Sequence, residues 1–509
     1  MAEKDNQKTN PAKSGSNQPK AGAKQENDMG ITVKKAEDIS AWYEQVCLKA
    51  ELAEFSTVKG CVVIRPNGYS LWESIQDHFN KRIKAIGVRN AYFPLFIPEH
   101  FFTKEAEHAT GFTPEVAWVT KAGDSQLEEP LAIRPTSETI INDSFSRWIR
   151  SYRDLPFRIN QWCNVVRWET KATKLFLRSR EFLWQEGHCV YESDEMCEKE
   201  VLMMLNEYKE MCEELLAIPV ITGRKTEKEK FAGAKHTYAI EALMPDGKAV
   251  QMGTSHHLGQ GFMKSFGVKV LGRDGKESIP YSSSWGVSTR MIGALVMTHS
   301  DDKGLVIPPK MAQTQVVIIP IIFDKYKEIT LMKCVDIKEK LKKQFSVFID
   351  DREDYSAGWK YNEWEVKGIP IRIEIGPKDI EKKQVVLVRR DTGKKAFIKE
   401  DEIAEEVQKE LEDMQKHLLM KSKKFLSEHI VEAKALSDVI KASDNGMMAL
   451  ADFCGEISCE EEVKDKTGGI TSRIILLDKK GQPEKVEQNT KCFHCGKEAK
   501  YRTYFSRSY

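Results

Sequence analysis

Long hydrophobic runs are missing from this sequence. The longest, residues 316–323, contains Pro320 and falls far short of the roughly 20 apolar residues that cross a bilayer. The first residues also lack the apolar stretch of a secretory signal peptide. We therefore expect a cytosolic protein with no membrane association, whose 11 cysteines stay reduced.

An excess of either charge is also absent. Lys and Arg together number 78 against 77 Asp and Glu, so the net charge gives no argument for a nucleic-acid partner. Any RNA site must be a local basic patch. With 41% hydrophobic and 30% charged residues, the composition is typical of a soluble globular enzyme. At roughly 100 to 200 residues per domain, the length predicts about three folding units.

Several well-known catalytic motifs do not occur. The sequence contains no G-x-x-x-x-G-K-[ST] phosphate loop, so any ATP site is of another type. The H-E-x-x-H zinc motif and the G-x-S-x-G nucleophile motif are missing too. These absences exclude the commonest P-loop, zinc-protease and serine-hydrolase designs.

Composition and periodicity divide the chain into four parts. Residues 1–29 are polar and contain no aromatic residue, which predicts a disordered tail. Residues 30–311 alternate short β-like and helical runs, and residues 312–408 follow a βαβ-like pattern. Residues 409–509 hold most of a long amphipathic helix and two cysteine pairs. The chain is thus predicted to be a multidomain α/β (α+β) protein.

The expected elements follow the hydrophobic spacing. Helices are predicted for residues 69–86, which Gly87 terminates, for 334–343 and for 405–426. Strands are predicted for residues 61–65, 92–97, 316–322, 345–349, 369–375 and 385–388. Pro94 inside one strand restricts that strand to a sheet edge, where it invites pairing with another subunit.

Charged and aromatic residues are concentrated in one predicted hairpin. Arg167 and Glu169 share a face where the first strand ends. The next strand is predicted to begin at Arg178, and its alternation would put four side chains on one face: Arg178, Arg180, Phe182 and Trp184. Because unpaired buried charges are costly, this pattern indicates a site for an anionic, aromatic ligand.

Four segments together carry a family resemblance. They are residues 92–98, residues 134–188, Gln251-Met-Gly-Thr-Ser-His-His257 and Trp285-Gly-Val-Ser-Thr-Arg290. In this order they resemble motif 1, the proline-binding loop with motif 2, a substrate-binding segment and motif 3 of the prolyl-tRNA synthetases. The resemblance extends from Ile31 to Tyr509. It implies an antiparallel class II catalytic domain, an α/β anticodon-binding domain and a small zinc-binding α/β domain.

The spacing between segments favours one type within the family. Residues 188–251 leave no room for the large editing insertion of many bacterial enzymes. The chain therefore resembles the archaeal and eukaryotic type, and we expect no editing within it. The resemblance further implies a homodimer, formed through the motif 1 region, that attaches L-proline to tRNA(Pro) with ATP and Mg²⁺.

The same resemblance implies roles for individual residues. Arginine suits an ATP site because its planar guanidinium can donate two hydrogen bonds to a phosphate and stays charged. Arg167 and Arg290 are the expected catalytic residues, holding the α-phosphate with the substrate carboxylate and the distal phosphates, respectively. Phe182 is expected to stack on adenine. Further ATP contacts are expected from Glu169, Arg178, Ser179, Gln251, Thr254 and Ser288, in part through Mg²⁺.

Proline brings a secondary ammonium and a small ring. The resemblance implies that Thr136 and Glu138 bind the ammonium. It also places Arg167, Trp184 and His256 in the proline-binding pocket. For the tRNA anticodon, Arg352, Lys360 and Glu365 are the candidates, although each is equally well explained as ordinary surface charge.

Four cysteines have the number and spacing of a structural zinc site. Cys454 and Cys459 form one pair, and Cys492 and Cys495 the other. Reduced thiols in the cytosol favour metal over disulfide. His494 lies between the second pair and remains an alternative ligand.

Three positions depart from the family pattern: Met252, Thr170 and Asn142. Competing hypotheses are a threonyl or histidyl synthetase on the same scaffold, a non-catalytic relative that binds tRNA or protein, and a zinc protein with a relic catalytic region. Arg167, Glu138 and Arg290 are all present, which argues against loss of catalysis.

Overall fold

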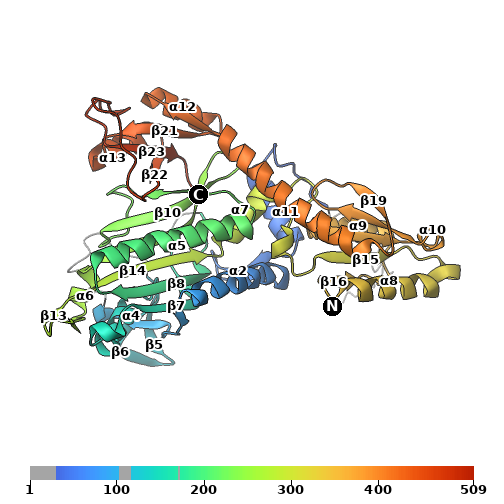
Figure 1. Ribbon diagram of the computed structural model, residues 1–509, viewed down its shortest axis with the longest axis horizontal. Coiled ribbons are helices and arrows are strands. Elements are labelled where there is room, and N and C mark those ends of the chain that lie inside the picture. Colours follow the sequence, from blue (N-terminus) through green and yellow to red (C-terminus); the bar gives the residue numbers. More distant parts are fainter. Residues whose placement is uncertain (1–29, 102–115, 170–171) are drawn as a thin grey trace, which may run out of the picture.

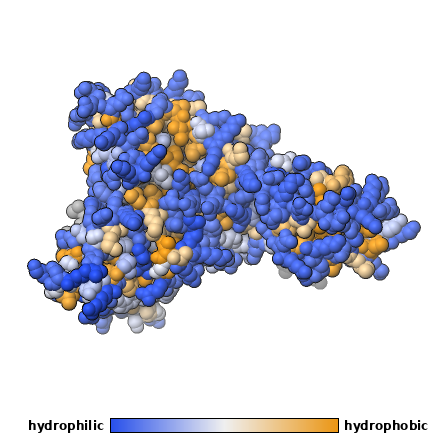
Figure 2. Space-filling view, viewed as in Figure 1, coloured by the Kyte–Doolittle hydropathy of each residue, from blue (hydrophilic) through white to orange (hydrophobic). Residues whose placement is uncertain are grey.

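A computed structural model describes residues 30–101, 116–169 and 172–509. The predicted tail, residues 1–29, and Thr170 lie outside these ranges. Figure 1 shows the N-terminal and C-terminal domains side by side, with the middle domain extending away from them. No helix among the described residues is long and apolar enough to span a membrane. Hydrophilic residues dominate the face of the molecule shown in Figure 2.

The N-terminal domain is built on seven strands of an 11-stranded sheet. Neighbouring strands are antiparallel except at the last pair, where β3 runs parallel to β7. In spatial order the seven strands are β9 (Ile221–Arg224), β10 (His236–Leu243), β11 (Ala249–Gly259), β14 (Tyr281–Ser288), β8 (Glu181–Tyr191), β7 (Phe157–Val166) and β3 (Arg89–Asn90).

Helices cover this sheet and bury its main core. Helix α5 (Asp194–Glu214) begins at its N-cap Ser193 and packs against the strands through buried residues such as Met204 and Tyr208. The predicted helix 69–86 is confirmed as α2 (Pro66–Ala85), which ends before Gly87. Two further helices complete the cover, α1 (Ile39–Lys49) and α7 (Arg290–His299).

Two predicted strands of this domain are shorter than expected. The strand predicted for 61–65 is β2 (Val62–Ile64), paired with β1 (Ala53–Phe55). Only β4 (Phe96–Pro98) forms where 92–97 was predicted, because Pro94 has no N–H for a ladder. Smaller elements are β5 (Trp118–Ala122), β6 (Ser125–Ile133), α4 (Glu138–Trp148), α6 (Gly261–Ser265), β12 (Val270–Leu271) and β13 (Glu277–Ser278), with a 3₁₀ turn at Tyr152–Asp154.

The second strand of the charged hairpin begins later than predicted. Strand β8 starts at Glu181, not at Arg178. Arg178 instead closes a tight loop with Lys174, in which each backbone N–H donates to the other residue's carbonyl at 2.9 and 2.7 Å. The alternation of β8 therefore covers Phe182 and Trp184 but does not apply to Arg178.

The middle domain contains a five-stranded mixed sheet. Its order is β16 (Val347–Ile349), β15 (Val316–Pro320), β17 (Ile371–Ile375), β18 (Gln384–Arg389) and β19 (Lys395–Lys399). Four of these strands were predicted. The fifth, β19, is an edge strand whose terminal lysines obscured its pattern. The helices are α8 (Lys327–Leu341), α9 (Ala357–Val366) and α10 (Pro377–Glu381), with 3₁₀ turns at Pro309–Met311 and Asp324–Tyr326.

Helix α11 (Ile403–Glu428) joins the middle domain to the C-terminal domain (Figure 1). The domain boundary expected after residue 408 falls inside this helix. Val407 and Leu411 pack into the core of the middle domain, whereas Met414 and Leu418 pack against Ala217 of the N-terminal domain. The continuous helix therefore packs against both the middle domain and the N-terminal domain.

The C-terminal domain completes the large sheet. It adds β22 (Thr471–Leu476), β23 (Tyr501–Ser506), β21 (Met448–Phe453) and β20 (Ile430–Ala433), covered by α12 (Leu436–Asp444) and α13 (Ile457–Lys466). Strand β22 pairs antiparallel with β9, with Leu476 opposite Gly223. A Cβ at Gly223 would lie 2.5 Å from the Ile475 carbonyl oxygen, so glycine permits this close approach.

Candidate active site

A cavity of about 510 Å³ lies on the sheet of the N-terminal domain. Strand β8 contributes Phe182, Trp184, Glu186 and His188, which alternate along the strand and so point to one side. The other lining residues come from the start of α4, the β7 end, β10, β11, β14, α7 and the 226–234 loop; among them are Thr136, Glu138, Arg167, Glu169, Gln251, Thr254, His256, Ser288 and Arg290.

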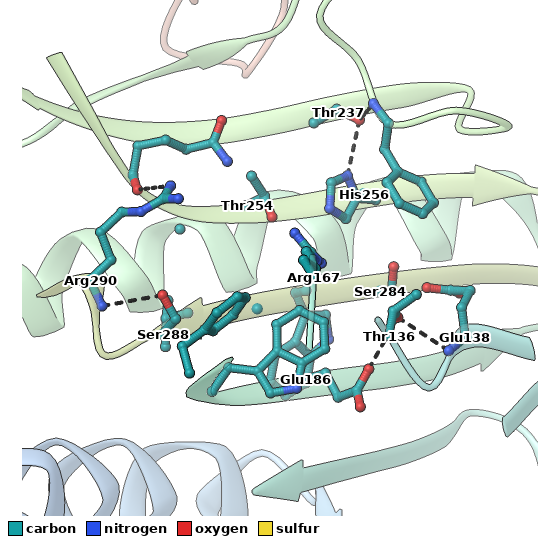
Figure 3. A pocket seen from close by; sticks show the side chains of 18 of the residues that line it. Thr136, Glu138, Arg167, Glu186, Thr237, Thr254, His256, Ser284, Ser288 and Arg290 are labelled. Carbon is teal, nitrogen blue, oxygen red and sulfur yellow. Dashed lines mark hydrogen bonds between the residues drawn. The ribbon is translucent and has the colours of Figure 1, made fainter. Parts of the chain in front are cut away.

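Arg167 lies in the middle of the cavity (Figure 3). Its Nε donates to the Pro135 carbonyl oxygen at 3.1 Å, and its guanidinium lies 5.7 and 5.4 Å from the Phe182 and Trp184 ring centroids. Burial lowers the pKa of Arg167, although Glu186 and Glu169 oppose the shift. A guanidinium stays charged even so, so the centre of the cavity is cationic.

Arg290 adds a second positive charge at one end. It is the first residue of α7, and it donates to the carbonyl oxygens of Gln251 at 3.3 Å and Leu177 at 3.2 Å. Burial, followed by the charges of Arg167 and Arg178, lowers the pKa of Arg290 to about 10. Within the described residues, neither Arg167 nor Arg290 has a carboxylate within 4.0 Å. Two partly buried guanidinium groups without a carboxylate partner favour a polyanionic ligand.

A cluster of alternating charges occupies the opposite end. His188 Nε2 lies 3.1 Å from Glu186 Oε2, and His188 Nδ1 lies 3.5 Å from Glu138 Oε1. Burial alone would lower the pKa of His188, but Glu138 and Glu186 raise it to about 10. Burial alone would raise the pKa of Glu186, but His188 and Ser137 lower it to about 2. His188 is thus held as an imidazolium and Glu186 as a carboxylate.

Glu138 lines the same end of the cavity. Its Oε1 has no well-aligned hydrogen bond within the described part of the chain. Its backbone N–H donates to Thr136 Oγ1 at 3.2 Å, which ties the two residues together at the start of α4. A buried carboxylate oxygen in this state is suited to a cationic ligand group.

His256 is a neutral wall of the cavity. Its Nδ1 lies 3.0 Å from Thr237 Oγ1, and its ring is 4.8 Å from that of Phe231. Burial, with help from the charges of His188 and Arg167, lowers the pKa of His256 to about 3. At neutral pH the ring is therefore a polar, uncharged surface.

The cavity brings together 11 of the 13 residues predicted for ATP and proline. Arg178 and Ser179 do not line the cavity, since both precede β8. Arg178 lines a separate cavity with Tyr43 and Tyr509, and the Ser179 hydroxyl donates to the Glu181 carbonyl at 2.8 Å.

Sequence reasoning missed several lining residues. Glu186 and His188 continue the alternation of Phe182 and Trp184, so the strand pattern already contained that signal. Glu229 and Phe231 come from a loop without periodicity, which left no comparable signal. Of the departures from the family pattern, Met252 lines the cavity, and the Asn142 amide donates to the Glu138 carbonyl at 2.7 Å.

Comparison with known proteins gives consistent results along the whole chain. The class II core model for synthetases of glycine, histidine, proline, serine and threonine matches residues 118–299. An anticodon-binding domain model matches 315–410, and the prolyl-tRNA synthetase C-terminal model matches 436–509.

Whole-length relatives decide among the synthetases. The proline–tRNA ligases of Natranaerobius thermophilus and Alkaliphilus oremlandii are each 50% identical, the first across 93% of this chain and 97% of its own. The chain belongs to the prolyl-tRNA synthetases. It is a proline–tRNA ligase, so the threonyl and histidyl alternatives are set aside. A crystal structure of prolyl-tRNA synthetase from Cryptosporidium parvum, complexed with halofuginone and AMPPNP, aligns with a TM-score of 0.90 and 46% identity over 94% of this chain and 97% of that one.

The three anticodon candidates of this synthetase differ in their surroundings. Arg352 is 40% exposed, pairs with Asp350 at 2.7 Å and lies over the Tyr355 ring at 5.0 Å. Lys360 is buried and donates to the Asp350 carbonyl at 3.0 Å, so contact with RNA would require its ammonium to leave this position. Glu365 pairs with Lys303 at 3.0 Å.

The four C-terminal cysteines of the synthetase form one group. Their sulfurs all lie within 4.8 Å of one another, with 3.9 Å between Cys459 and Cys492 and 3.6 Å between Cys454 and Cys495. A tetrahedral zinc with bonds of about 2.3 Å needs sulfurs about 3.8 Å apart, so the group fits this ion. His494 Nε2 instead lies 3.0 Å from Glu462 Oε2, and the histidine is outside the group.

Proposed function

We propose that the cavity makes prolyl-adenylate from L-proline and ATP, with ATP at the Arg290 end and proline at the Glu138 end. The position of Arg167 between these two ends carries the proposal (Figure 3). In the reaction, a proline carboxylate oxygen bonds to the α-phosphorus while the bond to the β-phosphate breaks and pyrophosphate leaves. Arg167 touches both reacting groups and stabilises the charge that spreads over the α-phosphate oxygens.

The ATP end is assigned to residues around Arg290. Arg290 holds the distal phosphates, and the Phe182 ring stacks on adenine. Glu169, Gln251, Thr254 and Ser288 complete the nucleotide site, and Mg²⁺ bound with ATP offsets the triphosphate charge. Arg178 acts from outside the cavity as a nearby positive charge, which its effect on the pKa of Arg290 supports. Ser179 acts by fixing the start of β8.

The proline end is assigned to the charge cluster around Glu138. The proline ammonium donates to Glu138 Oε1 and Thr136 Oγ1, while Trp184 and His256 wall the ring. His188 holds Glu138 and Glu186 in position through its two ring nitrogens. Because His256 is neutral, it adds no charge that would repel the ammonium.

Replacing Glu138 with Gln is expected to raise the KM for proline about 10- to 100-fold. The amide cannot form the charge-assisted bond, which is worth about 1.5 to 3 kcal/mol. Proline-dependent exchange of pyrophosphate with ATP measures this, and the KM for ATP should stay within twofold. An increase in both KM values would contradict the assignment of Glu138 to proline alone.

The same pocket is expected to activate alanine at a measurable rate. Each methylene that alanine lacks costs only about 0.8 kcal/mol of binding, so exclusion of smaller amino acids is weak. Alanine-dependent pyrophosphate exchange tests this, with E138Q as the control in which the KM values for proline and for alanine should both rise. Active enzyme without detectable alanine exchange would refute the prediction.

We also infer that the chain is of the archaeal and eukaryotic type, without an editing insertion. The short connection from β8 to β11 and the match to the prolyl-type C-terminal domain support this inference. We propose that the enzyme serves translation in the cytosol. Arg352 is proposed to contact the anticodon, with Lys360 and Glu365 supporting its loop.

A structural zinc ion is proposed for Cys454, Cys459, Cys492 and Cys495. The close packing of the four sulfurs supports it. Because four thiolates close the coordination sphere, such an ion would hold the C-terminal domain together and take no part in the chemistry.

A homodimer is proposed through the motif 1 region. Tyr92 and Phe96 are 72% and 44% exposed there, next to the short edge strand β3. Exposed aromatic side chains at a sheet edge favour contact with a second subunit. Sedimentation equilibrium should give twice the chain mass of 58.2 kDa, and a value near one chain would refute the dimer.

A further inference from the structure

Three buried charges join the C-terminal domain to the catalytic sheet. Arg473 of β22 donates to Glu241 Oε1 and Oε2 at 2.9 and 3.0 Å, and Lys225 Nζ lies 2.7 Å from Glu241 Oε1. The side chains are 7%, 0% and 3% exposed, respectively. We call Lys225, Glu241 and Arg473 the junction triad. Two of its members belong to the catalytic domain and one to the C-terminal domain.

The triad lies one strand away from the ATP end. Glu241 of β10 is opposite Gln251 of β11, at a point where the register shifts. The Gln251 carbonyl accepts the hydrogen bond from Arg290 Nη1, and Gln251 also lines the cavity. The path from Arg473 to Arg290 thus consists of one ion pair, one strand pairing and one hydrogen bond.

A second contact of β22 reaches the loop over the cavity. Ser472 Oγ lies 3.3 Å from Thr226 Oγ1, and both are buried. The Thr226 hydroxyl accepts from the backbone N–H of Glu229 at 3.3 Å. Since Glu229 lines the cavity, β22 supports the substrate site at two points.

The arginine contributes geometry as well as charge at this junction. Lys225 alone would balance the charge of Glu241. Arg473 adds a second cation, whose Nη2 group donates to both carboxylate oxygens. The pKa of Arg290 responds most to burial, Arg167 and Arg178, and then to Glu241, which raises it, and Arg473, which lowers it. The triad is therefore electrostatically close to the ATP end.

We propose that Arg473 is a positioning residue for adenylate formation: it fixes Glu241 on β10 and thereby keeps the Gln251 carbonyl and Arg290 in place for ATP. This inference rests on the proposed assignment of Arg290 to ATP. It makes the C-terminal domain a working part of the catalytic site, although none of its residues lines the cavity within the described part of the chain.

Kinetics of two matched arginine variants test the proposal. R473M should raise the KM for ATP about tenfold in proline-dependent pyrophosphate exchange and leave the KM for proline within twofold. R502M is the control, because Arg502 lies on the next strand, β23, and pairs with Glu432 within the C-terminal domain. It should leave both KM values within twofold, even if its melting temperature falls as much as that of R473M.

The conservative variant R473K separates positioning from folding. A lysine keeps the charge but lacks the planar guanidinium, which also donates to Thr471 Oγ1 at 3.3 Å, so its KM for ATP should lie between those of wild type and R473M. If R473M does not fold, R473K decides: a KM for ATP at least threefold above wild type supports the proposal, and a wild-type value overturns it. Equal changes in R473M and R502M, or parallel increases in the two KM values, would also overturn it. Wild-type enzyme without proline-dependent exchange would refute the proposed function instead.

Discussion

Replacing Arg167 with methionine is expected to lower kcat/KM for proline-dependent pyrophosphate exchange about 10³-fold. In the proposed reaction Arg167 alone touches both the proline carboxylate and the α-phosphate, so its charge acts where the transition state gains charge. Removing one such group from other enzymes costs about 10²- to 10³-fold. Lysine should recover only part of the loss, because its ammonium cannot form the bidentate contact.

Arg158 provides the matched control for this experiment. It lies on β7, the strand that leads to Arg167, and its Nε lies 2.7 Å from Glu200 Oε1 outside the cavity. R158M should lower the melting temperature but keep kcat/KM within threefold. If R158M loses as much activity as R167M, the effect of Arg167 is structural, and the proposed role fails.

The second large effect is expected from Cys492. Replacing it with alanine should abolish zinc binding, unfold the C-terminal domain and lower activity more than tenfold. A structural zinc site contributes apparent binding free energy of about 10 to 16 kcal/mol to folding, so one missing ligand is severe. Atomic absorption measures the bound zinc, and thermal unfolding measures the stability of the variant. Activity should fall because β22, which pairs with β9, belongs to the same domain.

Cys61 is the control for the zinc experiment. It is partly exposed and lies far along the chain from the four-sulfur group. C61A should keep both the metal and the melting temperature. An unchanged melting temperature in C492A, or zinc retained at one ion per chain, would contradict the structural zinc site.

The sequence predicted the site well where local periodicity carries the information. Phe182 and Trp184 alternate along β8 as expected, and the buried residues of α2 have the predicted spacing. The start of β8 was missed because the loop from Lys174 to Arg178 contains the same types of residue as the strand. Likewise, nothing in the sequence near Lys360 indicated that its ammonium is buried against Asp350.

Long-range pairing was the part that local patterns did not reveal. Gly223 and Leu476 are neighbours in the sheet but far apart in the chain, and nothing in either segment specifies the other. The junction triad follows from that pairing, because Glu241 and Arg473 meet only when β22 pairs with β9. Periodicity indicates which face of a strand is buried, but not which strand lies beside it.

Because a ribosome makes the chain from its N-terminus, β9 is synthesised long before its neighbour β22. Until residues 471–476 emerge, the outer edge of β9 has open backbone donors and acceptors, and Glu241 lacks Arg473. The nascent catalytic domain therefore carries an unpaired strand edge until those residues are made, and Lys225 is the only member of the triad that compensates Glu241. The C-terminal domain covers this edge when β22 pairs with β9. A chain that ended before residue 471 would tend to self-associate along the open edge.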